Sequence, residues 1–305
     1  MNTVKIKGME IKPGKGSAFS IETHPNMMKM HQNQLYVGCR GSGKTTALVN
    51  ILERLPFDRL FCISPSVKSN RDLMTRLKLK NEDIFENPDD ISVLDKIKYE
   101  VEKERDDYEK YLSDMKKWTS LQHALSTGNP MFHVSDDLLM EFFKQGDFQK
   151  PRPKYGHEGP PVLGLVLDDC LGSMLFTKGI RKLNALTIYH RHLGQLKDGG
   201  AIGLSLFFLV QSYKCQVGGL SKTIRGNCTS LVLFHTKSIK ELQEISEECS
   251  AEVSPDTFFK IVKMAHQDKH DFLLVDYHRK DSHPSAFRRN LDTFLVVPPP
   301  LDDTL

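Results

Sequence analysis

The feature that most constrains this chain is the stretch GCRGSGKT at residues 38–45, which fits the pattern G-x-x-x-x-G-K-[ST]. The strand-like run LYV comes before it, and TTALVNILERL after it places its apolar residues on one face of a helix that ends before Pro56. A strand, a glycine-rich turn and a helix in this order direct backbone N–H groups and a helix N-terminus at bound phosphate. The sequence therefore predicts a phosphate-binding loop between a strand and a helix.

The residues of this loop have distinct expected parts in holding a nucleotide. Lys44 would reach the β- and γ-phosphates, and the hydroxyl of Thr45 would be a ligand of Mg²⁺. The candidate nucleotide-binding residues are Gly38, Cys39, Arg40, Gly41, Ser42, Gly43, Lys44, Thr45 and Thr46. The loop alone names no reaction, because kinases, GTPases, motors and partition ATPases all carry one.

Downstream of the loop, candidate strands alternate with candidate helices. Their apolar cores are continuous rather than alternating, which is typical of strands in a parallel sheet with helices on both faces. The candidate strands are residues 35–37, 59–64, 162–168, 204–211, 230–235 and 272–277. The sequence therefore predicts an α/β fold with a mostly parallel sheet.

The expected organisation is an N-terminal lead-in at residues 1–33 and one P-loop domain at residues 34–300. A charged helical insertion at about 68–145 interrupts the domain, and a loop at 144–161, rich in Pro, Gly and charge, is expected to be flexible. Within the insertion, residues 91–124 predict one long helix with an apolar stripe. We favour a solvated helix that packs on its own domain by that stripe over a coiled-coil arm for a partner.

A pair of aspartates follows the apolar run PVLGLVL. Asp168 ends the predicted strand and is placed to hold Mg²⁺, and Asp169 could polarise the attacking water, a role that a glutamate usually takes in ATPase motors. The alternative is that Asp169 only caps the following helix. Residues 59–64 form a further strand between the loop and this pair in the sequence, an order typical of P-loop ATPases with an extra strand between the phosphate and acidic sites. The chain has no guanine-reading N-K-x-D, which disfavours GTP.

Two further polar residues complete the candidate catalytic set of Lys44, Asp168, Asp169, Gln211 and Arg225. Gln211 ends the strand LSLFFLVQ, where it could sense the γ-phosphate or orient water. Arg225 stands before another core strand and could act across a subunit interface as an arginine finger, or form an ordinary surface salt bridge.

Composition narrows the class of protein. The 305 residues contain no apolar run of about eighteen, so no membrane span is expected, and the first sixteen residues lack the apolar region of a signal peptide. Six scattered cysteines without a CxxC pair favour a reducing cytoplasm over a disulfide framework or zinc site. A net charge of +3 permits nucleic-acid binding without requiring it. The basic stretches YHRK (277–280) and FRRN (287–290) are candidates for DNA phosphate contacts, with solvated turns as the alternative.

Taken in order, six segments resemble the viral DNA-packaging ATPases of the FtsK/HerA superfamily. They are YVGCRGSGKTTALVNIL, FDRLFCISPSVKSN, LVLDDC, YHRHLG, LFFLVQS and IRGNCTSLVLF. The resemblance covers roughly residues 34–295 and is to the poxvirus-type branch found in large DNA viruses, virophages and polinton-like elements. No single segment specifies this branch, but the paired aspartates, the Arg-His pair at 191–192, the Gln after a strand and R-x-N before the next strand point to it together.

The resemblance implies a RecA-like P-loop NTPase core that uses ATP and Mg²⁺. It implies a homo-oligomeric ring that pumps double-stranded DNA into a preformed capsid, with capsid or portal-vertex proteins as partners. The location would be the host cytoplasm or a viral factory, and possibly the virion. By position, Lys44 and Thr45 bind phosphate and Mg²⁺, Asp168 and Asp169 form the acidic pair, and Gln211 is the sensor.

The resemblance also assigns parts to residues outside the nucleotide site. Arg225 matches a recurrent basic position, and Arg191 and His192 match a pair that would couple the nucleotide to a neighbour or to DNA, with polar residues on a helix surface as the alternative. Arg40 and Asp169 differ from many relatives, which puts the hydrolysis rate in doubt more than nucleotide binding.

Three other functions compete with a packaging motor. The first is another DNA pump of the same superfamily, and the second is an ATP-dependent switch or assembly protein that does not translocate. The third is a nucleotide kinase, which would need an acceptor site with an arginine-rich lid, and the segment after residue 170 offers no clear one.

Overall fold

The chain folds around one nine-stranded sheet. The computed structural model describes residues 21–126, 137, 140, 149–215, 217–236, 238–249 and 253–296. The strands are β1 (Asn33–Val37), β2 (Arg59–Ile63), β3 (Ile84–Phe85), β4 (Leu163–Asp168), β5 (Ser205–Val210), β6 (Ser230–Phe234), β7 (Phe272–Asp276), β8 (Phe287–Arg289) and β9 (Thr293–Phe294). The α-helices are α1 (Lys44–Leu52), α2 (Arg71–Arg76), α3 (Val93–Ser126), α5 (Ile180–Tyr189), α6 (Lys222–Gly226), α7 (Ile239–Cys249) and α8 (Pro255–Ala265). Short 3₁₀ turns cover Val67–Ser69, Asn81–Asp83 and His190–His192.

The strand order is β3-β2-β4-β5-β1-β6-β7-β8-β9. Neighbouring strands from β3 to β6 are parallel, and the pairs from β6 to β9 are antiparallel. The strand that separates the phosphate-loop strand β1 from the acidic strand β4 is β5, whereas β2 lies on the outer side of β4. The fold is therefore α/β, with the RecA-like P-loop core and mostly parallel sheet that the sequence predicts.

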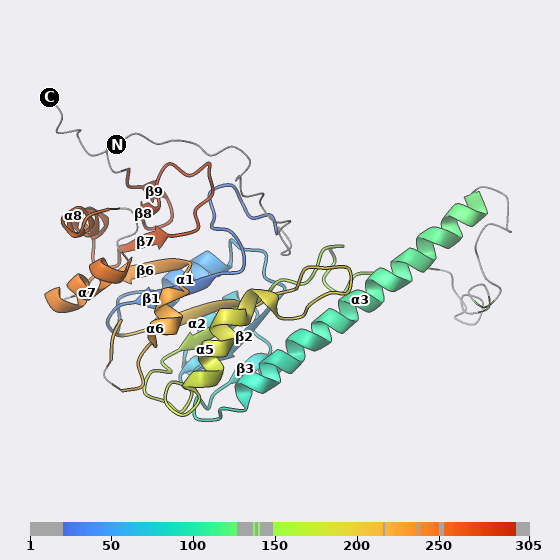
Figure 1. The fold of residues 1–305 in the computed structure, drawn as a ribbon, viewed down its shortest axis with the longest axis horizontal. Coiled ribbons are helices and arrows are strands. Elements are labelled where there is room, and N and C mark those ends of the chain that lie inside the picture. The colour runs from blue at the N-terminus through green and yellow to red at the C-terminus, as the bar shows by residue number, and fades with distance from the viewer. Residues whose placement is uncertain are drawn as a thin grey trace, which may run out of the picture.

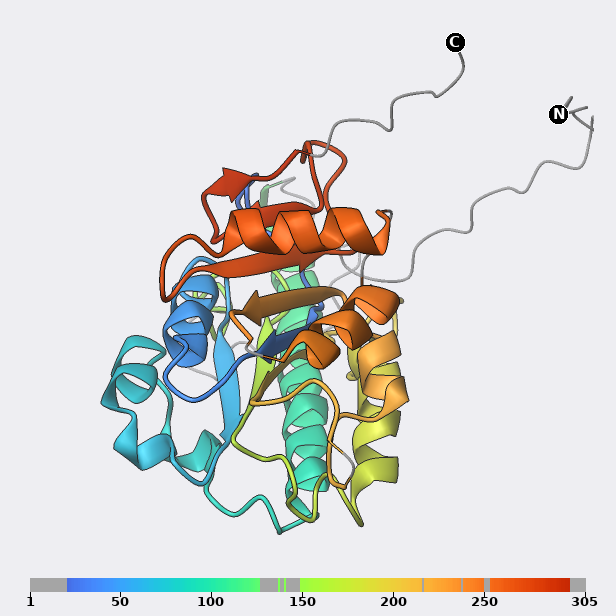
Figure 2. The ribbon, with the colours of Figure 1, turned by 90° about the vertical axis from the view of Figure 1, so that its left-hand side faces the viewer.

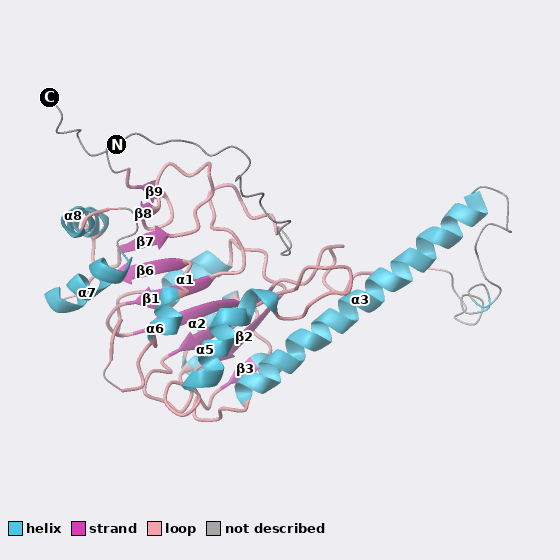
Figure 3. Ribbon diagram, viewed as in Figure 1, coloured by secondary structure: helices cyan, strands magenta, loops and turns pink. Residues whose placement is uncertain are grey.

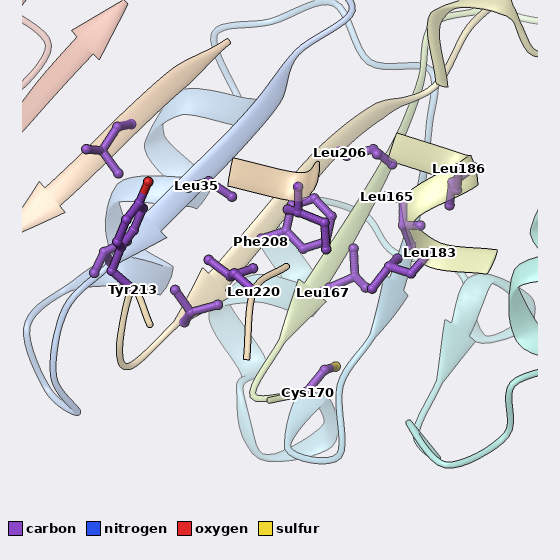
Figure 4. Packing of buried hydrophobic residues seen from close by; sticks show 14 of the residues in the cluster. Leu35, Leu165, Leu167, Cys170, Leu183, Leu186, Leu206, Phe208, Tyr213 and Leu220 are labelled. Carbon is purple, nitrogen blue, oxygen red and sulfur yellow. The ribbon is translucent and has the colours of Figure 1, made fainter. Parts of the chain in front are cut away.

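Helices cover both faces of the sheet (Figures 1 and 2). One apolar cluster joins α3, α5, α6, α7 and α8 to one face, and a second joins α1, α2 and the lead-in to the other. The side chains of β1 alternate between the two, because Leu35 and Val37 belong to the first cluster and Tyr36 to the second. Figure 4 shows part of the first cluster, in which Leu165 of β4 lies close to Leu183 and Leu186 of α5. Burial on both faces explains why the strands read as continuous apolar runs.

The long charged helix α3 begins and ends within two residues of the range expected for it. Val93, Leu94, Ile97 and Val101, in its first turns, pack into the first cluster, and the helix then runs past the edge of the body (Figure 3). Only the first half of the expected apolar stripe therefore packs on the sheet. None of the helices that the structure describes combines the length and the apolar composition that crossing a membrane requires.

A buried ion cluster holds the base of α3 against β2. The Arg59 guanidinium lies 2.6 Å from the Asp83 carboxylate and 3.0 Å from that of Glu104 on α3. Lys154 and Tyr155, from the loop before β4, also bond to the Glu104 carboxylate. This loop includes part of the range 144–161 that was expected to be flexible. That expectation, the domain boundaries and the extent of the insertion remain predictions, since residues 1–20 and most of 127–148 lie outside the described part.

The C-terminal strands and the turn before them contact residues 23–26 of the lead-in. One of the residues that makes these contacts also corrects a sequence interpretation. Arg288, a candidate for DNA contact, is buried in β8, with its guanidinium bonded to the Asn26 carbonyl and to His283 and stacked 4.2 Å from the Phe294 ring. A buried guanidinium with these contacts cannot reach DNA phosphates. The sequence misled here because antiparallel pairing of β8 turns this position inward.

Candidate functional site

The predicted phosphate loop joins β1 to α1 at the carboxyl end of the parallel strands. Gly43, before the first helical residue, has a φ of 105°, in the left-handed region that side chains disfavour. A Cβ on Gly38 would lie 2.6 Å from Cβ of Phe234, so only glycine fits against β6 at that point. These two glycines allow the chain to turn tightly around a bound group.

Polar groups inside the loop have few partners of their own. Nζ of Lys44 donates to the carbonyls of Gly38 and Cys39, at 2.6 and 3.0 Å. The hydroxyl of Ser42 is buried and has no hydrogen-bond partner among the described residues. A phosphate in the loop would offer acceptor oxygens to both side chains.

The acidic pair lies two strands away from β1. Asp168 is the last residue of β4 and is 9% exposed, whereas Asp169 is exposed and has a φ of 53°. Gln211, directly after β5, donates from Nε2 to Oδ1 of Asp169 at 3.2 Å. The capping alternative for Asp169 is excluded, because the next helix is α5, which begins at Ile180. A left-handed aspartate bonded to the next strand's glutamine is typical of a functional position rather than of helix capping.

Burial and charge perturb both ionisable groups that face the loop. Burial, reinforced by the Asp169 carboxylate, raises the pKa of Asp168 from 3.8 to about 6, although Lys44 opposes the rise. Burial lowers the pKa of Lys44, although the carboxylates of Asp168 and Asp169 oppose that change. Such opposed groups in one cavity are typical of a site that binds or transforms charged ligands.

A cavity of about 300 Å³ brings these groups together. Its lining residues are Arg40, Gly41, Lys44, Thr45, Ser66, Ser69, Asn70, Asp168, Asp169 and Gln211. The serines and Asn70 follow β2 and are not among the site residues that the sequence predicts. Their only signal was polar residues just after a buried strand, at the sheet edge where ligands bind in α/β proteins.

The oxygen groups of this cavity fit Mg²⁺. Thr45 offers a hydroxyl and Asp168 a carboxylate, the hard ligands that Mg²⁺ prefers. Burial and the Asp169 carboxylate raise the pKa of Asp168 despite Lys44, so a cation bound there would favour the ionised carboxylate. Thr45 and Asp168 are thus suited to hold a magnesium ion beside the phosphate loop.

The other predicted site residues lie apart from this cavity. Arg225 on α6 is 2.8 Å from the Glu248 carboxylate on α7, donates to the Leu220 carbonyl and stacks 5.3 Å from the Tyr213 ring. Within one subunit it is therefore part of an ion pair, and its role across an interface remains a prediction.

Arg191 is exposed and His192 is half-buried in the 3₁₀ turn after α5. This turn is joined to the amino end of β5 through the bond from Leu204 N to His190 O at 2.8 Å. The amino end of β5 is opposite the edge that carries the phosphate loop. A direct contact of this pair with the nucleotide is therefore excluded within one subunit, and its coupling role remains a prediction.

Comparison with known proteins gives no match to a family model and none to a curated protein. Solved structures that share the general arrangement include the cytoplasmic domain of the type VII secretion ATPase EccC of Thermomonospora curvata, at 15% identity and a TM-score of 0.41. That alignment covers 88% of this chain but only 26% of the solved EccC chain, so this chain spans about a quarter of that cytoplasmic domain.

Two other solved structures are similar to the chain at the same level. The DNA-packaging ATPase B204 of Sulfolobus turreted icosahedral virus aligns at 11% identity and a TM-score of 0.42, over 86% of this chain and 98% of B204. The pCW3 conjugation coupling protein TcpA aligns at 14% identity and a TM-score of 0.42, over 81% and 58%. At these levels of similarity, the function of the chain is judged from its site and its sequence motifs.

Proposed function

We propose that this chain is a Mg²⁺-dependent ATPase of the FtsK/HerA superfamily that translocates double-stranded DNA, and that it packages a viral genome into a preformed capsid. The observation that carries the ATPase proposal is one cavity lined by Lys44 and Thr45 of the phosphate loop, by the acidic pair and by Gln211. A phosphate loop that faced no acidic residue would support binding alone, whereas this arrangement supports hydrolysis.

Separate residues of the cavity would bind the phosphates, bind Mg²⁺ and activate the attacking water. Lys44 and the loop N–H groups hold the phosphates, and Thr45 and Asp168 hold Mg²⁺, which when bound would neutralise charge on the phosphate oxygens. Asp169 accepts a hydrogen bond from water and takes its proton as the water oxygen bonds to the γ-phosphorus. The bond from that phosphorus to the β–γ bridging oxygen then breaks, which leaves ADP and phosphate. Gln211, bonded to Asp169, fixes the carboxylate and can orient the same water.

The DNA-packaging part of the proposal is supported by the order of motifs along the sequence. In a ring of identical subunits, Arg225 would be placed to reach a neighbour's nucleotide, and Arg191 and His192 would face the neighbour or the DNA. The net charge of +3 suits an enzyme that must grip and release phosphates repeatedly. Capsid or portal-vertex proteins would be its docking partners, in the host cytoplasm or a viral factory and possibly in the virion.

ATP turnover by the purified protein, with and without double-stranded DNA, tests the proposal. We expect DNA to stimulate turnover, Asp169→Ala to abolish it, and an ATP analogue to raise the mass measured in solution to that of a ring. If DNA has no effect and Asp169→Ala leaves turnover unchanged, the motor is ruled out. Turnover that depends on Asp169 but not on DNA would favour the switch or assembly protein instead.

A further inference from the structure

A second and larger cavity opens on the opposite side of the phosphate loop. It has a volume of about 1070 Å³ and shares Gly41 and Thr45 with the catalytic cavity. Gly43 and Thr46 of the loop also line it. A ligand whose phosphates occupy the loop could therefore extend directly into this space.

Three segments that are distant in the sequence form the walls of this cavity. Asn50 comes from α1 and Arg54 from the turn that follows it, and Asn26 and Met27 come from the lead-in. The third wall is the C-terminal extension, which contributes His270 before β7 and the turn between β8 and β9. The wall residues of that turn are Asn290, Leu291 and Asp292.

Hydrogen bonds hold the lead-in wall in position. Nε2 of His283 contacts the Pro25 carbonyl at 2.8 Å, and the Arg288 guanidinium bonds to the Asn26 carbonyl. Lys280 donates to the carbonyls of Thr23 and His24. The C-terminal strands and the turn before them therefore fix residues 23–26 of the lead-in as a wall of this cavity.

The C-terminal wall is held as firmly and touches the phosphate loop. The Asn290 side chain accepts from Phe272 N at 3.1 Å and donates to Asp271 at 2.8 Å. Nδ1 of His270 lies 3.3 Å from the carbonyl of Ser42 inside the loop. This contact links the wall to the loop at the point where the chain begins to turn around phosphate.

We infer that this cavity binds the nucleoside part of the nucleotide, so that the lead-in and the C-terminal extension together form the base and ribose site. Met27, Ala47, Phe272 and Leu291 offer apolar surface for the faces of a planar base. Asn26, Asn50 and Asp292 offer polar groups for base edges or ribose hydroxyls. The inference rests on the proposed function, since it takes the phosphates to lie in the loop.

Calorimetric binding of ATP and of inorganic triphosphate, each with Mg²⁺, tests this inference. Asn50→Trp places a large ring in the cavity and leaves every phosphate-loop residue unchanged, although it removes the Asn50 bond to the Thr46 carbonyl. Thr119→Trp places the same ring at an exposed position of α3 as a control. We expect the wild type to bind ATP at least tenfold more tightly than triphosphate. Asn50→Trp should lose at least tenfold in ATP affinity and keep its triphosphate affinity, and Thr119→Trp should match the wild type.

The outcomes separate this inference from the proposed function. A wild type that binds neither ligand would overturn the ATPase and the nucleoside site together. Wild-type ATP affinity in Asn50→Trp, or an equal loss of both ligands, would overturn the nucleoside site alone. Photolabelling of the wild type with 8-azido-ATP provides a second measurement, with labelled peptides expected around residues 24–27, 50–54 and 290–292; labels confined to other peptides would contradict the site.

Discussion

Nε2 of Gln211 donates a hydrogen bond of 3.2 Å to Oδ1 of Asp169, and this bond joins the ends of two neighbouring parallel strands. Asp169 is held there with a φ of 53°, which an aspartate tolerates better than most residues but which still costs free energy. The glutamine therefore fixes the direction of a carboxylate that has no helix to cap. A carboxylate oriented in this way is suited to polarise the attacking water. This is the role that the longer glutamate usually takes in ATPase motors.

Asp169→Asn should abolish most ATP turnover while leaving the site intact. The amide still accepts the Gln211 hydrogen bond, but it cannot take a proton from water, so we expect the turnover number to fall about 10²-fold or more. Affinity for ATP, measured by calorimetry, should stay within about twofold of the wild type. Gln211→Ala is the matched variant, because it keeps the carboxylate but frees it, and its turnover should fall by about tenfold. Turnover near the wild-type rate in Asp169→Asn would show that another group is the base.

Asp168→Asn should stabilise the nucleotide-free protein at neutral pH. The folded-state pKa of about 6 lies above the ordinary 3.8, so the folded protein binds the proton more readily than the unfolded chain does. The ionised carboxylate therefore costs stability above pH 6, and that cost disappears as the pH falls towards 4. We expect a gain of about 2 kcal/mol at pH 7 and no gain near pH 4, from urea unfolding at both values.

The control for this variant is Asp281→Asn, a change at an exposed aspartate, which should alter stability little at either pH. ATP hydrolysis by Asp168→Asn should be lost, because the amide is a poor ligand for Mg²⁺. A stability gain of equal size at pH 4 and pH 7 would contradict the assignment, since it could not come from ionisation.

The sequence was sufficient to locate the phosphate loop, the acidic pair and the parallel core, because each depends on a local pattern. Asp168 ends β4 because an apolar run buried on both faces stops there, and the same reasoning placed Gln211 at the end of β5. Residues whose role depends on distant contacts left no such signal. Arg288 looks like a surface cation until β8 pairs with β7 and buries it.

The larger cavity beside the phosphate loop also could not be predicted from the sequence, because distant segments form it. Two of its walls come from the lead-in and from residues 270–292, which are far apart in the chain. They meet through the second apolar cluster and through hydrogen bonds such as that between His283 and the Pro25 carbonyl. No local periodicity marks His270 or Asn290 as neighbours of the phosphate loop. Ser66 and Asn70 were similarly missed, because a polar loop after a strand is common in any α/β protein.

Mutations can separate two roles of Arg225. One is its ion pair with Glu248, and the other is its proposed contact with the nucleotide of a neighbouring subunit. Burial raises the pKa of Glu248, but hydrogen bonds from Arg225, Lys214 and Tyr213 outweigh it and bring that pKa to about 2. Arg225→Ala and Glu248→Gln should therefore each lower the free energy of unfolding by about 1 kcal/mol, because each breaks the same partly exposed network. Only Arg225→Ala should also abolish ATP turnover in the assembled protein.

Mixing two inactive proteins gives the decisive measurement for Arg225. Subunits with Lys44→Ala keep Arg225, and subunits with Arg225→Ala keep the phosphate loop, so mixed rings would contain some complete interfaces. We expect ATP turnover to reappear on mixing, and mixtures of Lys44→Ala with the wild type to provide the reference. Absence of recovery in rings shown to be mixed would mean that Arg225 serves its own subunit only.

Arg59→Met should be among the most destabilising single changes in this protein. The side chains of Asp83 and Glu104 are only 2% and 1% exposed, and the guanidinium of Arg59 neutralises both. Removing the cation leaves buried carboxylates with less compensation, which typically costs about 3–5 kcal/mol. Lys154 and Tyr155 keep their bonds to Glu104, so Asp83 should bear most of the loss. The control is Lys182→Met, which breaks an exposed pair with Asp95 and should cost about 0.5 kcal/mol or less.

Arg59→Met should also loosen the catalytic cavity, because Arg59 lies on β2 and residues that follow β2 line that cavity. Arg59 begins the strand whose far end leads to Ser66, Ser69 and Asn70, so loosening α3 and the Asp83 turn frees one wall of that cavity. In urea unfolding at pH 7, Arg59→Met should lose more stability than Arg59→Lys, which keeps the positive charge. An equal loss in the two variants would mean that packing of the Arg59 side chain on the Phe61 ring, 4.8 Å away, matters more than its charge.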